Sequence, residues 1–275
     1  MMSTKIISWL NTATATLSSA DILTARLDSL VLLEDTTGKD RGWLLAHPEY
    51  ELSQTQVKKL DGFIERRTTH EPLAYIRHKT EFYGREFYVD RRVLEPRPDS
   101  ETMIDLLKSL KLLSKSIIID IGTGSGALAI TAKLELPQNQ VLASDNDPNC
   151  LTIARGNASR LAAEINFYQG DLLNGVPSNM LRLPATIIMN LPYVPDDFPI
   201  NKAAESEPKT AILGGSDGLD LYRQIFRQIT KLELKPDYIL TEAMPPQHER
   251  LAEIAGAAGF RLTKTDDFIQ LFEQF

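Results

Sequence analysis

One stretch decides the fold: Ile117-Ile118-Ile119-Asp120-Ile121-Gly122-Thr123-Gly124-Ser125-Gly126. Its apolar, β-branched start predicts a buried strand over 116–120, and the alanine-rich run that begins at Ala127 predicts a helix. The glycines between them let the backbone turn tightly and leave room for a ligand that a Cβ atom would fill. The spacing Gly-x-Gly-x-Gly differs from that of dinucleotide-binding turns, so the turn alone fits either a tight connection or a nucleotide site.

Strands and helices alternate on the carboxyl side of this turn. We predict further strands over 140–144, 165–169, 185–190 and 238–241, and helices from Ala127, from Pro148, over about 219–232 and over 247–258. Such alternation predicts an α/β fold with a mostly parallel sheet covered on both faces. Two last segments, 261–265 and 268–273, predict a hairpin that places an antiparallel strand at the sheet edge.

The amino-terminal part has a helical pattern instead. Ser53-Gln54-Thr55-Gln56 is a capping box, and it predicts a helix that buries Val57, Leu60, Phe63 and Ile64. We expect an earlier helix to begin near Ser18 or Ser19. Its buried face is predicted to carry Ile22, Leu23, Leu27, Leu30 and Val31.

A β-hairpin and a further helix are predicted between these two parts. Residues 81–83 and 86–89 flank Gly84-Arg85 as aromatic strands, and a helix with Asp99 and Ser100 as candidate N-caps is expected to run to about Leu113. The predicted organisation is therefore a small helical substrate-recognition domain over 1–70, a linker with a hairpin over 71–98, and an α/β domain over 99–275.

Composition narrows the classes of protein. With 275 residues, 43% of them hydrophobic, the chain can form one large domain and a smaller one. Its formal charge of −7 argues against broad binding to nucleic-acid phosphates. The single cysteine, Cys150, and four scattered histidines predict neither an internal disulfide nor a metal site. No segment approaches the roughly 20 apolar residues of a membrane helix, so we expect a cytoplasmic protein, acting as a monomer.

The ends of the predicted strands carry carboxylates that suit a nucleoside. Asp145 ends the second strand, where it can accept hydrogen bonds from both hydroxyls of a ribose; as a helix cap, Asp147 is better placed. Asp120 can neutralise an α-amino group, and Asp171 follows the third strand where an adenine should lie. A ligand with these needs and no pyrophosphate is S-adenosylmethionine. The predicted cofactor-binding residues are Asp120, Gly122, Thr123, Gly124, Ser125, Gly126, Asp145, Asp171, Leu172 and Asn190.

The fourth strand ends in Asn190-Leu191-Pro192-Tyr193, which predicts methyl transfer to a planar nitrogen. Such a nitrogen is a poor nucleophile because its lone pair is delocalised, so its N–H groups must be held on acceptors. The Asn190 side-chain oxygen and the Leu191 carbonyl can do this, and Tyr193 can stack on the substrate while Pro192 stiffens the loop. The alternative is an ordinary turn that ends a strand.

Several segments resemble, in order, the release factor glutamine methyltransferase family. They are Pro72-Leu73-Ala74-Tyr75-Ile76, Glu81-Phe82-Tyr83-Gly84, the run from Val93 to Thr102, Asp120 to Gly126, Glu207-Pro208 and Gly218-Leu219-Asp220-Leu221-Tyr222. The resemblance implies a class I methyltransferase fold. It also implies N5-methylation of the glutamine in the Gly-Gly-Gln loop of peptide-chain release factors, with the helical domain and the hairpin helping to hold that protein.

The chain departs from this family at two positions. Leu191 stands where the family usually has proline; it keeps the acceptor carbonyl and is expected to leave the loop less rigid. Leu172 stands where many members have an aromatic residue. Asn-Leu-Pro-Tyr also resembles the motif of ribosomal RNA adenine dimethyltransferases, so the alternatives are an adenine N6-methyltransferase on RNA or DNA and a cofactor-binding module without catalysis. Glu207 and Glu242 fit a substrate cleft and a solvated surface equally well.

Overall fold

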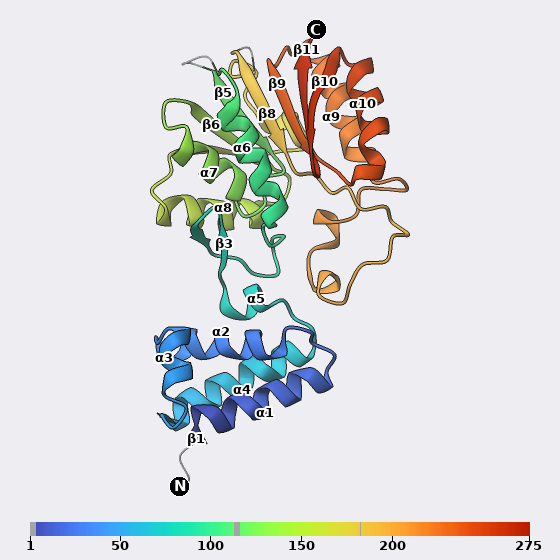
Figure 1. Ribbon diagram of the computed structural model, residues 1–275. Coiled ribbons are helices and arrows are strands. Elements are labelled where there is room, and N and C mark those ends of the chain that lie inside the picture. The colour runs from blue at the N-terminus through green and yellow to red at the C-terminus, as the bar shows by residue number, and fades with distance from the viewer. Residues whose placement is uncertain (1–3, 113–115, 182) are drawn as a thin grey trace. The chain divides into compact units, whose positions relative to one another are not determined.

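The computed structural model describes residues 4–112, 116–181 and 183–275 (Figure 1). The chain forms two compact units. The first comprises Met1–His78 with Asn201–Ser206, and the second comprises Lys79–Ile200 with Glu207–Phe275. None of the described helices is both long and apolar enough to cross a membrane.

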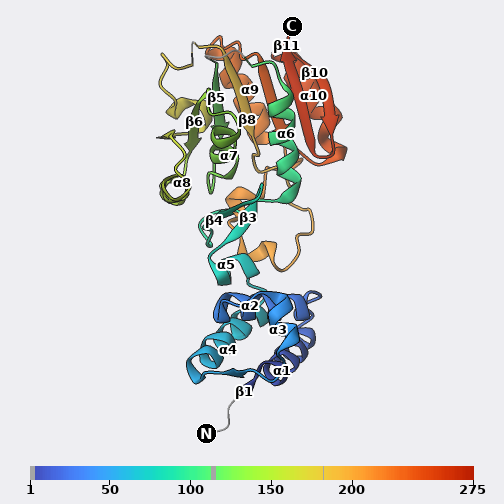
Figure 2. The same cartoon turned by 60° about the vertical axis from the view of Figure 1, so that its left-hand side comes forward.

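The first unit is a helical bundle (Figure 2). Its core is aliphatic and almost fully buried, with Leu17, Leu32, Leu33, Leu44 and Leu60 at the centre. A short antiparallel pairing of β1 (Thr4–Lys5) with β2 (Glu51–Leu52) joins two distant points of this unit. The helices are α1 (Ile6–Ser19), α2 (Ala25–Thr37), α3 (Arg41–Ala46), α4 (Gln54–Thr68) and α5 (Leu73–Arg77).

The capping box at the start of α4 is confirmed. The Gln56 backbone N–H donates to Ser53 Oγ at 3.2 Å, and the Ser53 N–H donates to Gln56 Oε1 at 2.9 Å. The helix buries Leu60 and Ile64. Local hydrogen bonding of this kind depends on neighbours in the sequence, which is why it was predictable.

The helix predicted from Ser18 or Ser19 is wrong. Ser19 ends α1, and Asp21 has a φ of +60°, a conformation that breaks the helix before α2 begins. Leu23 is therefore fully exposed and Leu27 is 47% exposed, whereas Leu30 is buried. The apolar pattern continues across the break, and periodicity alone does not reveal a change of helix axis.

The predicted β-hairpin is confirmed, with its strands displaced toward the amino terminus. They are β3 (Thr80–Phe82) and β4 (Arg85–Phe87), paired antiparallel. Tyr83 and Gly84 both have positive φ, as a two-residue type I′ turn requires. Phe82 and Phe87 are buried and meet edge to face, with ring centroids 6.2 Å apart.

The second unit contains the predicted α/β sheet. Its strand order is β10-β11-β9-β8-β5-β6-β7; β5 to β9 run parallel, and the β10–β11 hairpin adds antiparallel strands at one edge. The strands are β5 (Ile117–Ile121), β6 (Gln140–Asp145), β7 (Ile165–Gln169), β8 (Ala185–Met189), β9 (Tyr238–Glu242), β10 (Phe260–Asp266) and β11 (Ile269–Gln274).

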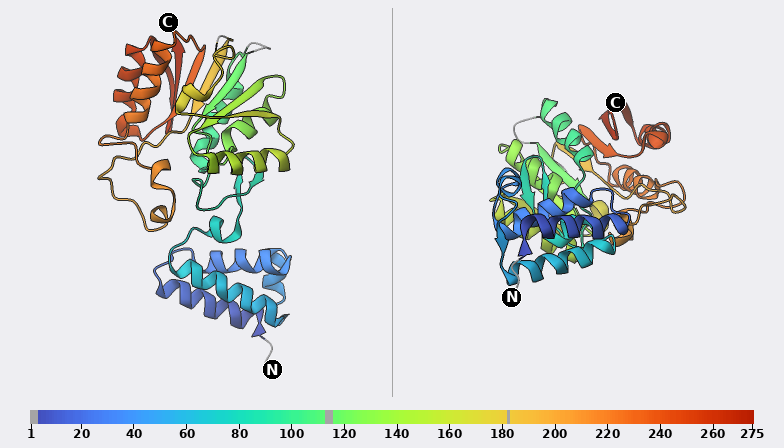
Figure 3. Two further views of the ribbon diagram at one scale, coloured as in Figure 1. Left: turned by 180° about the vertical axis from the view of Figure 1, so that it is seen from behind. Right: turned by 60° about the horizontal axis from the view of Figure 1, so that its bottom comes forward.

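Helices cover both faces of this sheet (Figure 3). They are α6 (Glu101–Ser109), α7 (Ala127–Glu135), α8 (Pro148–Arg160), α9 (Asp220–Lys231) and α10 (His248–Ala257). Helices α6, α7 and α8 pack on one face and helices α9 and α10 on the other, in two separate apolar clusters. The strand order reverses between β6–β7 and β8–β9, which makes the carboxyl end of β5 a topological switch point.

The entry into α6 differs from the prediction. Neither Asp99 nor Ser100 caps the helix, because the chain enters it through a 3₁₀ turn, Pro98–Ser100, in which Ser100 already has helical φ and ψ. The Ser100 hydroxyl instead donates to Glu242 Oε2 at 2.6 Å. The helix ends at Ser109, before the predicted end near Leu113, which lies outside the described residues.

Candidate active site

A cavity lies at the carboxyl ends of four neighbouring parallel strands, β7, β6, β5 and β8. It brings together residues that lie as far apart in the sequence as Arg92 and Leu221. The predicted residues in its walls are Gly122, Gly124, Asp145, Asp171, Leu172, Asn190, Leu191 and Pro192. The remaining predicted residues, Asp120, Thr123, Ser125, Gly126 and Tyr193, do not line it directly. Other walls come from Arg92, Leu94, Cys150, Pro208, Thr210, Ala211 and Leu221.

The glycine turn leaves no space for side chains at two of its positions. Gly122, Gly124 and Gly126 have φ values of +73°, +54° and +84°. A Cβ atom at position 122 would lie 2.9 Å from Leu191 Cδ2, and one at position 126 would lie 2.9 Å from Ile130 Cδ1. Nothing lies within 4 Å of a Cβ built at Gly124, which lines the cavity. The turn therefore packs on both sides and presents bare backbone to the cavity.

Asp145 is held rigidly beside this turn. One carboxylate oxygen accepts the Gly124 N–H at 2.9 Å and the other accepts the Asp147 N–H at 3.0 Å. Burial raises the pKa of the Asp145 carboxyl, while these backbone bonds favour its charged form. Asp147, as expected, caps α8 by accepting the Asn149 N–H at 2.8 Å. Because each carboxylate oxygen has a second lone pair, Asp145 can still accept from two hydroxyls of a ligand.

Asp120 lies behind the turn and is almost completely buried. Its Oδ2 accepts from Thr123 Oγ1 at 2.6 Å and from the Ala129 N–H at 3.2 Å. Its Oδ1 has no hydrogen-bond partner among the described residues. Burial raises the pKa of the Asp120 carboxyl to about 7, against the two hydrogen bonds. A buried carboxylate oxygen without a partner suits a cationic group of a bound ligand.

Asp171 and Leu172 form the wall after β7. Asp171 Oδ2 accepts from Gln224 Nε2 at 2.6 Å, which ties this wall to α9. Leu172 has a φ of +54°, and its carbonyl accepts from Ser144 Oγ at 3.1 Å. The leucine side chain is buried and gives the cavity an apolar surface where the sequence predicts an adenine.

The loop after β8 is anchored at three of its four residues. Asn190 Nδ2 donates to Ser100 Oγ at 3.0 Å, and Tyr193 donates its hydroxyl to Glu242 Oε1 at 3.0 Å. The Leu191 side chain is buried in the core, and its backbone N–H donates to the Tyr222 hydroxyl at 3.4 Å. Proline has no N–H, so this last bond is available only because Leu191 replaces it.

Glu242 and Glu207, which the sequence left undecided, are both buried and are not solvated surface acids. Glu242 accepts from Ser100 and Tyr193, and burial raises its pKa. Glu207 pairs with Arg97 and also accepts the Glu95 N–H at 3.3 Å; burial raises its pKa as well. The sequence signal for Glu242 was its position at the end of β9, the strand next to the one that carries Asn190.

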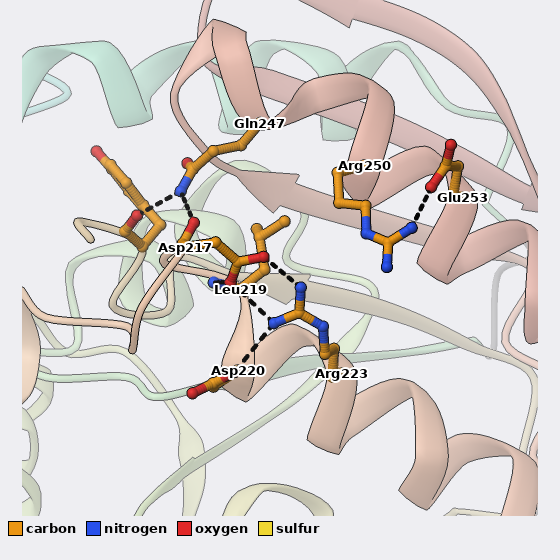
Figure 4. Close-up of polar contacts among 8 residues, drawn as sticks. Asp217, Leu219, Asp220, Arg223, Gln247, Arg250 and Glu253 are labelled. Carbon is orange, nitrogen blue, oxygen red and sulfur yellow. Dashed lines mark hydrogen bonds and ion pairs between the residues drawn. The ribbon is translucent and has the colours of Figure 1, made fainter. Parts of the chain in front are cut away.

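A second group of residues holds the outer side of the same loop (Figure 4). Gln247 Nε2 donates to the Tyr193 carbonyl at 2.7 Å and to the Asp217 carbonyl at 2.8 Å. Arg223 pairs with Asp217 and lowers the pKa of that carboxyl to about 2. A Cβ atom at Gly218 would lie 2.0 Å from the Tyr193 carbonyl oxygen, so only glycine allows this approach. Sequence reasoning missed Gln247, because nothing local marks it.

No cluster of three or more His, Cys, Asp or Glu side chains that could hold a metal ion occurs within residues 4–112, 116–181 and 183–275. The side chains that line the cavity offer carboxylates, amides and hydroxyls, together with the Arg92 guanidinium and the Cys150 thiol. Such groups can bind a nucleoside beside the glycine turn and align a polar nitrogen at the loop after β8, since both line the same cavity.

Comparison with known proteins gives matches along most of the chain. The family model of the PrmC N-terminal domain matches residues 8–77, and that of the methyltransferase small domain matches residues 97–204. The release factor glutamine methyltransferase of Coxiella burnetii is 35% identical over 240 residues, 86% of each chain. The relatives of the same name from Koribacter versatilis and Deinococcus radiodurans are 36% and 32% identical, over 80% and 92% of this chain and 79% and 90% of theirs.

Solved structures share the fold. The hMettl16 catalytic domain in complex with the MAT2A 3'UTR hairpin 6 aligns with a TM-score of 0.53 at 15% identity, covering 81% of this chain and 82% of that one. A methyltransferase from Pyrococcus furiosus aligns with a TM-score of 0.50 at 16% identity, covering 70% and 89%. At these identities the likeness shows a shared fold alone.

The raised pKa of Asp120 predicts a stability that falls as the pH rises. Its folded-state pKa is about 7 and its ordinary value is 3.8, so between them the folded chain binds a proton that the unfolded chain has lost. The free energy of unfolding therefore decreases through this window. Asp120→Asn has no carboxyl to titrate and so removes this fall. Between about pH 4 and pH 8 the parent should therefore lose about 2–4 kcal/mol of unfolding free energy relative to Asp120→Asn. Urea unfolding at several pH values measures the free energy of unfolding of both proteins. If that free energy changed with pH equally in the two proteins, the prediction would be contradicted.

Proposed function

The chain belongs to the release factor glutamine methyltransferase family, and we propose that it transfers a methyl group from S-adenosylmethionine to the side-chain amide nitrogen of a glutamine in a peptide-chain release factor. The observation that carries this proposal is the position of Asn190 and Leu191 in the wall of the same cavity as Gly124 and Asp145. The glutamine proposed is the one in the Gly-Gly-Gln motif.

The residues around the cavity fit the cofactor. The bare backbone at Gly124 allows close approach, and Asp145 can accept from both ribose hydroxyls. Leu172 offers an apolar surface for the adenine, with Asp171 beside it. We assign the α-amino contact to Asp120, whose buried Oδ1 has no partner among the described residues, although Asp120 does not line the cavity. When bound, S-adenosylmethionine supplies an electrophilic methyl group on a sulfonium sulfur.

The loop Asn190-Leu191-Pro192-Tyr193, which we name the transfer loop for its proposed role, would orient the amide nitrogen by holding both of its N–H groups. Asn190 Oδ1 and the Leu191 carbonyl each accept one N–H of the glutamine amide, which aims the nitrogen at the methyl group and stabilises the positive charge that develops on it. As the N–C bond forms and the methyl–sulfur bond breaks, the nitrogen would release one proton to solvent, which leaves a neutral methylated amide and a neutral thioether. Pro192 limits the freedom of the loop, and the Tyr193 ring offers a flat surface to the amide. Alignment is the larger part of catalysis in this scheme.

The helical domain and the linker, whose Arg92 and Leu94 also line the cavity, are proposed to bind the protein substrate. We assign this role to the helical domain, 1–70, and to the linker with the hairpin, 71–98, and methyl transfer to residues 99–275. The family resemblance in both parts supports this division. Because release factors act on ribosomes, the proposed substrate places the enzyme in the cytoplasm, where we propose that it acts as a monomer.

Asn-Leu-Pro-Tyr keeps a second candidate open, an adenine N6-methyltransferase on RNA or DNA. An adenine amino group is also a planar nitrogen, and the same two acceptors could hold it. The net charge of −7 weighs against a nucleic-acid substrate, since phosphate binding depends on Lys and Arg. A cofactor-binding module without catalysis is the third possibility, and it requires that no substrate receives the methyl group.

One labelling experiment separates these candidates. Purified protein is incubated with methyl-labelled S-adenosylmethionine and, in separate reactions, with a release factor, ribosomal RNA and DNA. We expect mass spectrometry to find one added methyl group on the Gly-Gly-Gln peptide of the release factor. Label on adenine but not on this peptide would refute the proposal, and cofactor binding without label on any substrate would favour the third possibility.

Asn190→Ala tests the acceptor role. Removing the side-chain oxygen should lower the turnover number by at least about 100-fold, as for other groups that act on developing charge, while much of the affinity for S-adenosylmethionine remains. Rates with saturating cofactor and calorimetric titration measure the two quantities. Asn166→Ala, at an exposed position on β7, is the control and should keep parental turnover. An unchanged rate for Asn190→Ala would remove Asn190 from the mechanism.

Asp145→Ala tests the ribose contact. Loss of a charged acceptor for two hydroxyls should weaken S-adenosylmethionine binding by about 10- to 100-fold. The matched control is Asp40→Ala, which removes the N-cap of α3 at a residue that does not line the cavity and should lower the melting temperature with little effect on the affinity. Equal affinities for the parent and Asp145→Ala in a titration would place the ribose contact elsewhere.

A further inference from the structure

Glu242 is a fully buried carboxylate that the reaction outlined above does not use. It ends β9, next to β8, which leads into the Asn190 loop. Its Oε2 accepts from Ser100 Oγ at 2.6 Å, and its Oε1 accepts from the Tyr193 hydroxyl at 3.0 Å. Ser100 Oγ in turn accepts from Asn190 Nδ2 at 3.0 Å. A continuous chain of hydrogen bonds thus runs from Glu242 through Ser100 to Asn190.

The direction of the hydrogens in this chain is determined by chemistry. In the ionised form of Glu242 both carboxylate oxygens only accept, here from Ser100 and Tyr193, so the single hydroxyl hydrogen of Ser100 points to Glu242. Ser100 Oγ can then only accept from Asn190, which must turn its NH₂ group toward the serine. No described residue donates to Asn190 Oδ1, so this oxygen remains for a ligand.

This orientation matters because the two ends of an amide have opposite roles. With Oδ1 toward the cavity, Asn190 accepts an N–H of the substrate. With the amide rotated by half a turn, it would present two further hydrogens to a nitrogen that already carries two. At the Asn190 position a flipped side chain would therefore repel the group that has to be methylated.

We propose that Glu242, acting through Ser100, is a positioning residue that fixes the Asn190 amide with its oxygen toward the substrate nitrogen. The inference rests on the proposed function for its catalytic consequence, but the orientation itself is a property of the ligand-free protein. Ser100 links the two groups because its hydroxyl donates to the carboxylate and accepts from the Asn190 NH₂ group. Neither residue contacts the substrate in this scheme.

Glu242 also holds the rest of the loop. Its main-chain carbonyl accepts from the Tyr222 hydroxyl, which accepts from the Leu191 N–H, and its second carboxylate oxygen holds the Tyr193 hydroxyl. Hydrogen bonds therefore connect one residue of the neighbouring strand, directly or through Ser100 and Tyr222, to three residues of the loop: Asn190, Leu191 and Tyr193. A residue with this arrangement can set the distance of the loop from the sheet as well as the orientation of the amide.

Four variants test the proposal. Ser100→Ala and Glu242→Gln should lower the turnover number on a release factor by about 10- to 100-fold, the range found when a partner that orients a functional ligand is removed. The KM for the release factor and the affinity for S-adenosylmethionine should change by less than about threefold, since the lost interaction is used in the transition state. Ser100→Thr keeps the hydroxyl and should restore turnover to within about threefold of the parent.

The matched control is Thr241→Val. Thr241 precedes Glu242 on β9, is equally buried, and its hydroxyl has no hydrogen-bond partner among the described residues. The substitution keeps the shape and should leave turnover unchanged. Melting temperatures of all four variants identify any that fails to fold. If Glu242→Gln does so, the comparison of Ser100→Ala with Ser100→Thr decides.

A second measurement needs no substrate. The side-chain amide signals of Asn190 in a ¹H–¹⁵N NMR spectrum, assigned by their loss in Asn190→Asp, should shift in Ser100→Ala and Glu242→Gln but not in Thr241→Val. Unshifted signals in Ser100→Ala, or parental turnover of that variant, would overturn the inference. If the parent methylates no release factor while the signals shift as expected, the proposed function fails and the positioning of Asn190 stands.

Discussion

The parallel hydrogen bonding of β5 with β6 on one side and β8 on the other is the constraint on which the cavity depends. Ile121 is paired with Ser144 in one neighbour and with Met189 in the other. The next residue of each strand region, Gly122, Asp145 and Asn190, therefore arrives at the same edge of the sheet. Ligands bind outside the carboxyl ends of parallel strands where the order reverses, and here the reversal brings together the residues proposed to bind the cofactor and those proposed to hold the substrate nitrogen.

Buried carboxylates are concentrated at this edge, and each is stabilised by hydrogen bonds that also position a neighbour. Asp145 holds the glycine turn, Asp120 holds the start of α7, Glu207 holds the segment around Arg97, and Glu242 holds the transfer loop. Removing a carboxylate from water is costly unless it is well bonded, so such groups lose their freedom to move. Of these four carboxylates only Asp145 lines the cavity, and the other three hold in place the segments around it.

Leu191 changes how the loop is held in place but keeps the main-chain carbonyl that the proposed mechanism uses. Its carbonyl is retained, its N–H is bonded to Tyr222, and its side chain fills the space beside Gly122 that a Cβ atom there would need. The loop was expected to be less rigid than one with proline. In the structure the hydrogen bond from the Leu191 N–H to Tyr222 takes the place of the proline ring as a restraint on the loop. The Leu191 side chain also lies beside Gly122 of the glycine turn.

The sequence by itself determined the α/β alternation, the glycine turn and the Asn190 motif, because periodicity, tight turns and strand ends depend on neighbouring residues. It also identified the caps at Ser53 and Asp147. Only the tertiary structure decided that Glu242 contacts Ser100 across 142 positions, since no local pattern marks partners so far apart. The same holds for the break at Asp21, where the apolar period continues while the helix axis changes. Local physics specified the elements, and packing specified which buried polar groups meet.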